Sequence, residues 1–279
     1  MKKLLLAIGL SLMGIVTAAA ADMSPAPIYT KAPMMVAPVY NWTGFYLGGT
    51  LGGAWGSSDP TTSTVFSPPG YFAATSVPAV NAAGLQHVSP NGFTGGIEAG
   101  YNWQAGNWVW GIETDFQAFD LSGSATSTGA YPCCAPATFA VASKVSTSWL
   151  FTARPRLGFA SNNWLFYATG GVAVADLKGN FAFSDNCGSV VGCNGPGFPN
   201  AAEAAAFSTT KTGYTVGGGI EAGIGGGWTL KGEYLFVDLG SSTVGGLMTP
   251  QLFNSNTNPF THSADLRANI VRAGLNFRF

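Results

Sequence analysis

The chain has 279 residues, and its 12 Lys or Arg and 13 Asp or Glu make only 9% of it charged, against about 25% in an average soluble domain. Glycine contributes 39 residues, aromatic residues make up 13% of the chain, and the mean hydropathy is +0.23. Beyond the N-terminus no run of about 18 apolar residues occurs, which excludes an ordinary helical membrane protein. A net charge of -1 argues against a nucleic-acid-binding protein, because such proteins carry a clustered basic excess. The composition favours β-structure with one apolar face.

The N-terminus is typical of a secretory signal peptide over residues 1–21. Lys2 and Lys3 form a positive start, residues 4–16 an apolar core, and residues 18–21 a run of small residues suited to cleavage. A retained transmembrane helix is the alternative, but glycines and alanines weaken a span that is already minimal.

The next segment, residues 22–40, holds four prolines without regular spacing: Pro25, Pro27, Pro33 and Pro38. Because proline fixes its backbone angle and lacks a donor N–H, this density excludes a helix or a central strand. We therefore expect an extended periplasmic leader over 22–40, followed by a folded domain over 41–279.

After the leader, apolar or aromatic residues alternate with small or polar ones. In the clearest case Trp108, Trp110 and Ile112 fall on one face, and Glu113 and Asp115 fall on the other. A period of two indicates a β-strand. Carboxylates opposite tryptophans indicate that the two faces meet different surroundings.

Eight such segments occur, at 42–56, 91–104, 108–121, 145–161, 163–177, 210–226, 227–240 and 264–279. Each exceeds the ~9–11 residues with which a tilted strand crosses a bilayer. An even number of antiparallel strands can close into a ring and so remove the free edges that lipid does not tolerate. We therefore predict an all-β fold, an eight-stranded antiparallel up-and-down transmembrane β-barrel.

The connections between these segments alternate in length. Three are short, at 105–107, at Asn162 and at 226–227, whereas four are long, at 57–90, 122–144, 178–209 and 241–263. Barrels of the bacterial outer membrane have short periplasmic turns and long extracellular loops. The pattern therefore predicts the orientation of the barrel as well.

Nine charged residues share the face opposite the tryptophans: Glu98, Glu113, Asp115, Arg154, Arg156, Glu221, Lys231, Glu233 and Arg272. A soluble ligand-binding barrel would instead turn its apolar face inward. Charges that are costly in lipid can pair inside a narrow barrel, and the interior of eight strands is only just wide enough for side chains. We expect the paired charges to lock the barrel; a narrow water-filled path is the alternative.

Pro155 stands between Arg154 and Arg156 and so falls on the lipid-facing side. Since proline cannot donate to a strand ladder, we expect a local break in pairing, or a bulge, at this residue.

Five stretches carry a family resemblance: Asn-Trp-Thr-Gly-Phe-Tyr-Leu-Gly-Gly at 41–49, Gly-Tyr-Asn-Trp-Gln at 100–104, Gly-Ile-Glu-Thr-Asp-Phe at 111–116, Glu-Tyr-Leu-Phe-Val-Asp-Leu-Gly at 233–240 and Val-Arg-Ala-Gly-Leu-Asn-Phe-Arg-Phe at 271–279. In this order they resemble the alphaproteobacterial outer-membrane immunogenic proteins of Brucella, Bartonella and the rhizobia. The resemblance covers essentially the whole mature chain and implies an eight-stranded outer-membrane barrel that is an abundant surface antigen. Some family members are similar to haemin-binding proteins or small porins. The family usually has Arg-Gly-Arg where this chain has Arg-Pro-Arg at 154–156.

The final aromatic residue, Phe279, resembles the signal that the barrel-assembly machinery reads in outer-membrane proteins. The alternative is an ordinary aromatic residue at the membrane interface.

All four cysteines, Cys133, Cys134, Cys187 and Cys193, lie in predicted outer loops. In an oxidising compartment we expect disulfides, with three pairings open. Cys187 and Cys193 close a short loop easily. The adjacent pair would be strained if bonded to itself, so bridges between the two loops are the alternative. Asp185 alone gives a metal site little support.

His87 and His262 lie in the first and fourth long connections, which flank the seam where the barrel closes. Near the outer mouth the two side chains could approach each other and ligate haem iron or a metal; two solvated loop histidines are the alternative. Ser263 and Asp265 adjoin His262, as residues of this kind do in outer-membrane hydrolases, but such neighbours are common in loops rich in Ser and Thr. No cofactor is indicated.

The sequence therefore favours a non-enzymatic, structural and surface-exposed outer-membrane protein. The alternatives are a small porin-like diffusion channel and a surface ligand-binding protein or adhesin of the haemin-binding type. Expected partners are outer-membrane lipid and lipopolysaccharide, the barrel-assembly machinery, and a host or environmental ligand at the loops, but not nucleic acid.

Overall fold

A computed structural model describes residues 40–68, 70–193, 199–249 and 258–279. The expected signal peptide, and the expected leader up to residue 39, lie outside the described residues and stay predictions. Within the described part, no helix is long and apolar enough to cross a membrane.

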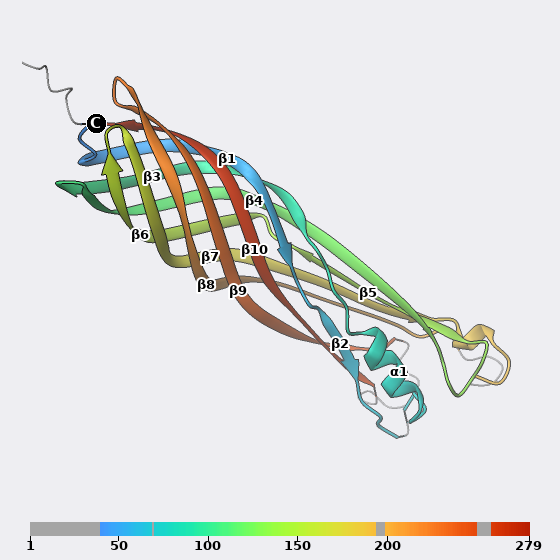
Figure 1. Cartoon of the computed structure of the whole chain (residues 1–279). Helices are drawn as coiled ribbons and strands as arrows, with labels where there is room; N and C mark the ends of the chain where they lie inside the picture. The colour runs from blue at the N-terminus through green and yellow to red at the C-terminus, as the bar shows by residue number, and fades with distance from the viewer. Residues whose placement is uncertain (1–39, 69, 194–198, 250–257) are drawn as a thin grey trace, which may run out of the picture. The chain divides into compact units, whose positions relative to one another are not determined.

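Antiparallel strands make up most of the described chain (Figure 1). In chain order the elements are β1 (Gly44–Ser57), β2 (Thr61–Thr64), α1 (Ser76–Ala83), β3 (Asn91–Ala105), β4 (Trp108–Ala130), β5 (Thr138–Ser146), β6 (Trp149–Ser161), β7 (Trp164–Asp185), the short helix η1 (Cys187–Ser189), β8 (Ala202–Gly225), β9 (Trp228–Leu247) and β10 (Pro259–Arg278).

The strands close into a ring with eight positions. Pairing runs β1–β3–β4, through β5 and β6 to β7, then β8–β9–β10, and β10 pairs with β1. β5 and β6 share one position, because each of them pairs with both β4 and β7. The strand is interrupted between β5 and β6, at residues 147–148. There the carboxylate of Asp176 accepts the backbone N–H groups of Ser148 and Trp149 at 2.7 and 3.0 Å. The predicted eight-stranded barrel is confirmed.

The three predicted short connections are tight two-residue turns at 106–107, 162–163 and 226–227. Gly106 and Asn162 have φ of 58° and 54° there. This left-handed region costs glycine nothing and asparagine little, which is why these residue types end the strands here.

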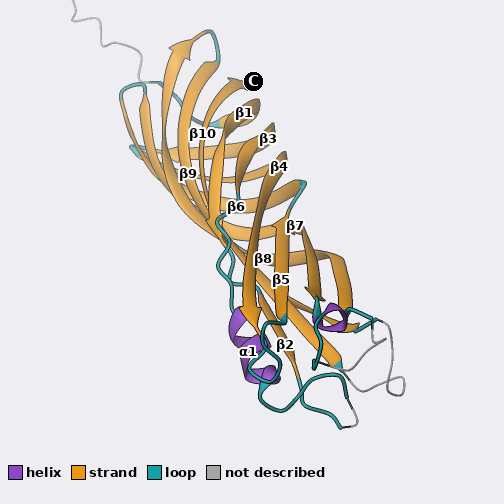
Figure 2. Ribbon diagram, turned by 90° about the vertical axis from the view of Figure 1, so that its right-hand side faces the viewer, coloured by secondary structure: helices purple, strands orange, loops and turns teal. Residues whose placement is uncertain are grey.

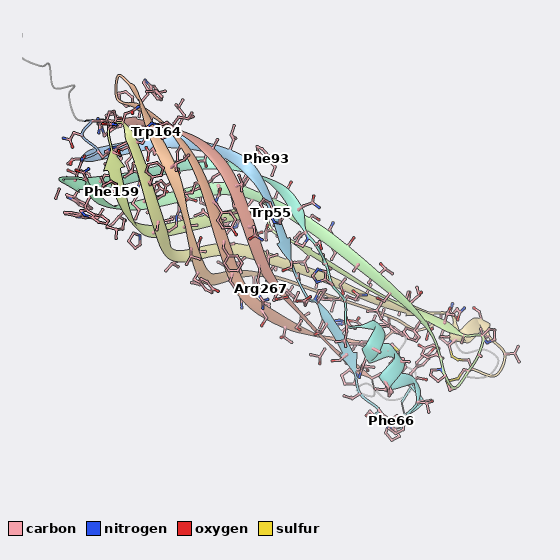
Figure 3. All side chains as sticks on the ribbon, viewed as in Figure 1. Trp55, Phe66, Phe93, Phe159, Trp164 and Arg267 are labelled. Atoms are coloured by element: carbon pink, nitrogen blue, oxygen red, sulfur yellow. A yellow bond between two sulfur atoms is a disulfide. The ribbon has the colours of Figure 1, made fainter. Side chains whose placement is uncertain are left out.

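The outward side chains form an apolar band between two aromatic rows. The row at the short-turn end contains exposed Trp103, Trp108, Phe159, Trp164 and Trp228. The second row contains exposed Trp55, Phe93, Phe116, Tyr214 and Tyr234. Figure 3 labels two residues of each row, at opposite ends of the band. Such rows mark the two membrane interfaces of outer-membrane barrels.

Pro155 breaks the ladder on one side only. It pairs with Ile112 of β4, but the register with β7 skips from the pair Ala153 and Val172 to the pair Arg156 and Thr169. The hydroxyl of Thr169 donates to the carbonyl oxygen of Pro155 at 2.9 Å. The predicted break is confirmed, and Thr169 satisfies a carbonyl that would otherwise face lipid.

The prediction of long loops after the third, fifth and seventh segments is wrong, because strands continue into all three. β4 continues to Ala130, β7 to Asp185 and β9 to Leu247, and the strands that face them begin at Thr138, Ala202 and Pro259. Outside the membrane neither face of a strand has to be apolar, so these stretches of Ser, Thr, Ala and Gly carry no alternation strong enough to predict a strand.

The parts of the strands that continue beyond the membrane, here called the extension, separate into two sheets. Pairing between β8 and β9 ends at Tyr214 and Asp238 and resumes only at the bridge between Ala202 and Thr249. One sheet is therefore β4–β5–β7–β8 and the other β9–β10–β2, and α1 contacts β2, β4 and β5 (Figure 2). The first long connection supplies β2 and α1.

Candidate functional site

The nine charged residues predicted to face inward all lie inside the barrel. They come from β3, β4, β6, β8, β9 and β10, and none is more than 4% exposed. Each occupies an inward position of its strand, because burial alternates residue by residue and the neighbouring side chains point to lipid. Alternation turns five carboxylates and four cations inward, and the strand register brings them together in one enclosed layer.

Arg154 lies at the centre of this charged layer. Its Nη2 is 2.6 Å from Glu113 Oε1 and 2.8 Å from Asp115 Oδ2, and its Nη1 is 3.3 Å from Glu233 Oε1. Three carboxylates from two strands therefore share one guanidinium. Charge-assisted contacts of this kind are strong where water is excluded.

Lys231 and Arg272 connect the remaining acids on this side. The Lys231 ammonium is 2.6 Å from Glu98 Oε2 and 3.0 Å from Glu113 Oε1. Arg272 donates from Nε to Glu233 Oε2 at 2.7 Å. Arg272 and Glu233 are direct cross-strand neighbours on β10 and β9. The Lys231 pairs instead join β9 to β3 and β4, which are not its neighbours, and so link opposite walls of the barrel.

Arg156 extends the charged layer toward the short-turn end. Its Nη2 is 2.8 Å from Glu221 Oε2 and its Nη1 is 3.0 Å from Glu113 Oε2. Two phenols complete the layer: Tyr46 donates to Glu113 at 2.6 Å and Tyr167 donates to Glu233 at 2.9 Å. Sequence reasoning missed both tyrosines as members, although their inward position follows from the same alternation.

Glycine makes room for these long side chains. A Cβ on Gly100 would lie 2.4 Å from the Tyr46 hydroxyl, and a Cβ on Gly52 would lie 2.7 Å from the Cα of Arg272. Any larger residue at these inward positions would displace the charged layer or the backbone behind it.

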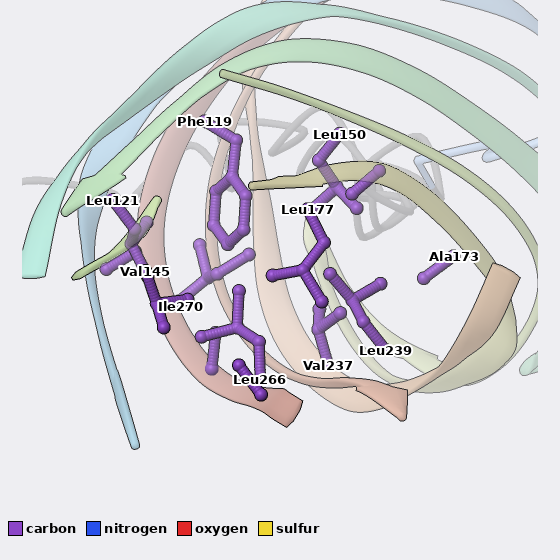
Figure 4. Packing of buried hydrophobic residues seen from close by; sticks show 14 of the residues in the cluster. Phe119, Leu121, Val145, Leu150, Ala173, Leu177, Val237, Leu239, Leu266 and Ile270 are labelled. Atoms are coloured by element: carbon purple, nitrogen blue, oxygen red, sulfur yellow. The ribbon is translucent and has the colours of Figure 1, made fainter. Parts of the chain in front are cut away.

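Two apolar layers enclose the charged layer. On the outer side lies an apolar plug of buried residues that includes Phe119, Leu121, Leu150, Leu177, Leu235, Val237, Leu239, Leu266 and Ile270 (Figure 4). At the short-turn end, Trp42, Val109, Ala160, Leu165 and Tyr167 form a second cluster. Sequence reasoning missed the apolar plug, yet its residues stand at inward positions further along β4, β6, β9 and β10, which carry charges, and along β7.

The prediction that His87 and His262 meet at the outer mouth is wrong. The His87 side chain is 61% exposed and lies 2.7 Å from Asp59. His262 is fully buried, with Nδ1 2.9 Å from the Thr62 hydroxyl and Nε2 3.1 Å from Glu203 Oε2. Because β10 extends past the membrane, His262 is an inward strand residue and not a loop residue. The described residues contain no group of three or more His, Cys, Asp or Glu side chains placed to hold a metal ion.

Both cysteine pairs form disulfides within their own loops, Cys133 with Cys134 and Cys187 with Cys193. The alternative bridges between the loops are therefore not formed. The two loops nevertheless touch, since Cys134 Sγ lies 3.9 Å from the carbonyl oxygen of Cys193.

Asp185 holds the extracellular tip together. Its Oδ2 accepts the hydroxyls of Tyr71 and Tyr131, each at 2.8 Å, and its Oδ1 accepts the Ala201 N–H at 2.8 Å. Burial raises the pKa of Tyr131, and the negative charge of Asp185 raises it further, so this phenol remains a donor. Three separate segments converge on one carboxylate.

Phe279 lies at the short-turn end of the barrel. It is 73% exposed, its N–H donates to the Phe45 carbonyl oxygen at 3.0 Å, and its ring centroid is 5.7 Å from that of Phe45. This position suits an interface aromatic, and its role as an assembly signal stays a prediction.

Comparison with known proteins agrees with this geometry. Residues 8–279 match the model of the family described as outer membrane protein beta-barrel domain. The chain belongs to this family. It is 33% identical over 287 residues to the 31 kDa outer-membrane immunogenic protein of Brucella melitensis, with 100% of both chains covered. It is also 28% identical over 244 residues to the 22 kDa outer membrane protein of Rhizobium leguminosarum, covering 88% of this chain and 81% of that protein.

Membership of this family confirms the predicted location of the protein in the outer membrane and its resemblance to the immunogenic surface antigens. Among solved structures, the outer membrane protein OprG of Pseudomonas aeruginosa is 10% identical, with a TM-score of 0.40, over 86% of this chain and 98% of that one.

Proposed function

We propose that this protein is a non-enzymatic outer-membrane barrel with a closed interior, whose extended outer strands present a surface to the environment. The observation that carries the proposal is the apolar plug above the charged layer. Phe119, Leu177 and Leu235 are all fully buried within it. The charged layer therefore acts as an internal brace.

A diffusion channel is the weaker candidate, because an ion would have to cross the apolar plug. Hydrophobic constrictions exclude water and so block conduction, and moving a charge into such surroundings costs several kcal/mol. The charged layer gives no path either, since its cations are held by carboxylates at 2.6–3.3 Å.

A hydrolase would need a histidine that reaches substrate. His262 is fully buried, and the hydroxyl of the neighbouring Ser263 pairs with Thr61 at 2.7 Å. His87 is exposed but pairs with Asp59. Neither arrangement supports a nucleophile activated by an adjacent base.

Recording from planar lipid bilayers tests the proposal. We expect the purified, folded protein to give no steady conductance at concentrations at which a 16-stranded porin gives regular steps. Replacing both Leu177 and Leu235 with Ala should introduce conductance by opening the apolar plug, whereas Leu157→Ala on the lipid face should not. Regular ohmic steps from the unaltered protein would contradict a closed interior.

A further inference from the structure

Two lysines stand side by side on the outward face of the extension. Lys144 of β5 lies opposite Asn180 of β7, and Lys178 of β7 lies opposite Ser146 of β5. They are therefore diagonal neighbours on adjacent antiparallel strands, with Cβ atoms about 7–8 Å apart. Their shared face also presents the hydroxyl of Ser146 and the amide of Asn180, so the patch offers several hydrogen-bond donors.

These lysines lie at the height of the outer headgroups. Val174 is the last large apolar outward residue of β7, and Trp149 begins β6 directly beneath β5. Lys178 follows Val174 by four residues, which is about 13 Å along a strand at ~3.3 Å per residue and about 10 Å of height for a strand tilted ~40°. The headgroup layer extends about 5–8 Å beyond the hydrocarbon, within reach of a lysine side chain.

Lys144 is the cation of the patch that no acid among the described residues pairs with. Within the described chain Lys144 has no hydrogen bond or ion pair, and its side chain is exposed. Lys178 contacts Asp176 Oδ2 at 2.9 Å and the Ser148 hydroxyl at 2.6 Å. Two acids border these lysines. Asp176 contacts Lys178, and its other oxygen already accepts two backbone N–H groups. Asp120 of β4 is exposed and lies beside Ser148, whose carbonyl oxygen accepts the N–H of Phe119.

The same level on β9 and β10 has the opposite character. There Arg267 lies among Asp59, Asp238 and Asp265 in one shallow hollow. Its guanidinium is 3.6 Å from Asp238 and 3.9 Å from Asp265. This acidic side provides an internal comparison, because it also holds an exposed cation at the membrane edge but pairs that cation with acids.

We propose that Lys144 and Lys178, with Ser146 and Asn180, bind a phosphate group of lipopolysaccharide in the outer leaflet. The acyl chains of the same molecule would lie on the apolar band below. Anionic headgroups attract exposed Lys side chains at the membrane surface, and two cations with neutral donors between them match a phosphate. The inference rests on the outward orientation of the long strands in the proposed function, but not on a closed interior.

Titration of the folded protein in detergent micelles tests the proposal, with purified lipopolysaccharide as ligand and native mass spectrometry as readout. We expect the double variant Lys144→Ala/Lys178→Ala to bind about 10-fold more weakly. Lys144→Arg/Lys178→Arg should retain affinity, and Arg267→Ala should be unchanged. Heat-modified gel mobility verifies that each variant is folded, which these exposed positions allow.

Three results with lipopolysaccharide would overturn the proposal. They are equal affinity of the unaltered protein and the double alanine variant, an equal loss in Arg267→Ala, and undiminished binding of enzymatically dephosphorylated lipopolysaccharide. A final measurement compares binding to phosphatidylglycerol vesicles with binding to lipopolysaccharide. The proposal expects weaker binding to phosphatidylglycerol. Equal binding would contradict lipopolysaccharide as the specific ligand. Conductance recordings do not bear on any of these outcomes, so this proposal and the closed interior fail independently.

Discussion

At the scale of single residues, Arg154 decides whether the charged layer is balanced. Its guanidinium reaches Glu113, Asp115 and Glu233, and all four side chains are buried. A buried ion pair adds little to stability compared with an apolar pair, but removing one partner leaves an uncompensated buried charge. We therefore expect the loss of stability on removing Arg154 to exceed the net stabilisation that its ion pairs provide.

We predict that Arg154→Ala lowers the free energy of unfolding by about 3–5 kcal/mol, because three carboxylates then share fewer cations in a dry interior. Urea titration followed by heat-modified gel mobility measures the change. Arg267→Ala, which removes an exposed cation, should cost less than about 1 kcal/mol. Equal unfolding midpoints for Arg154→Ala and the unaltered protein would show that the charged layer does not brace the barrel.

Phe279 allows a test of assembly that is separate from stability. Phe279→Ser should reduce the amount of barrel in the outer membrane of cells several-fold, because the assembly machinery loses its signal. Refolding of the same variant into detergent should be unchanged. The matched change Phe45→Ser removes the neighbouring interface aromatic and should leave assembly intact; similar losses for the two variants would assign Phe279 an interface role only.

Asp176 predicts a pH dependence at the outer interface. Burial raises the pKa of this carboxyl, but the N–H groups of Ser148 and Trp149 and the ammonium of Lys178 outweigh it, so its pKa lies below the usual value. The stabilisation is therefore present above the ordinary pKa of about 3.9 and is lost as the pH falls through the lowered value. NMR titration of the Ser148 and Trp149 amides should show a midpoint below the ordinary pKa. A midpoint at or above it would remove this role.

At the scale of elements, the break at Pro155 is repaired by a side chain. The Thr169 hydroxyl donates to the Pro155 carbonyl oxygen. Within the membrane no water is present to donate in its place. We predict that Thr169→Val destabilises the barrel by about 1–3 kcal/mol. In a Pro155→Gly background, where the ladder can re-form, the same change should cost clearly less. A double-mutant cycle measures the difference, and additive effects would contradict the repair.

The sequence was sufficient to predict those parts of each strand that contact lipid. Trp108, Ile112 and Phe116 alternate with Val109, Glu113 and Gln117 because one face of β4 meets acyl chains and the other meets the interior. Beyond Leu121 the same strand continues as Ser, Gly, Ala and Thr. There the outer face meets water and the two faces no longer differ in polarity, so the sequence pattern does not distinguish this strand from a loop.

The candidate site was predictable to the same extent. The alternation of side chains along each strand predicts that Glu113 and Arg154 point inward, and the structure places their charged groups 2.6 Å apart. Alternation does not predict which charged residues pair across the barrel, because that depends on the stagger of strands far apart in the sequence. The position of His262 is not predictable for the same reason as the outer strands, because the alternation indicates a strand only from residue 264.

At the scale of the whole barrel, the interior is layered. An apolar cluster closes the short-turn end, the charged layer follows, and the apolar plug, whose packing is drawn in Figure 4, lies beyond it. A further apolar cluster, with Phe72, Phe139 and Phe183, fills the tip beneath the disulfide loops. These packed layers support the long strands from inside, which suits a protein that presents an extended surface.

The most direct test of the enclosed charged layer is chemical access to its centre. Thr152 lies in the layer, is fully buried and donates to Asp115 at 2.6 Å, whereas Ser124 is exposed on the extension. Thr152→Cys and Ser124→Cys, in barrels reconstituted into vesicles, are treated with a charged, water-soluble methanethiosulfonate. Ser124→Cys should react within minutes, and Thr152→Cys should stay unmodified for hours unless the barrel is unfolded. Rapid modification of Thr152→Cys in the folded barrel would contradict the account.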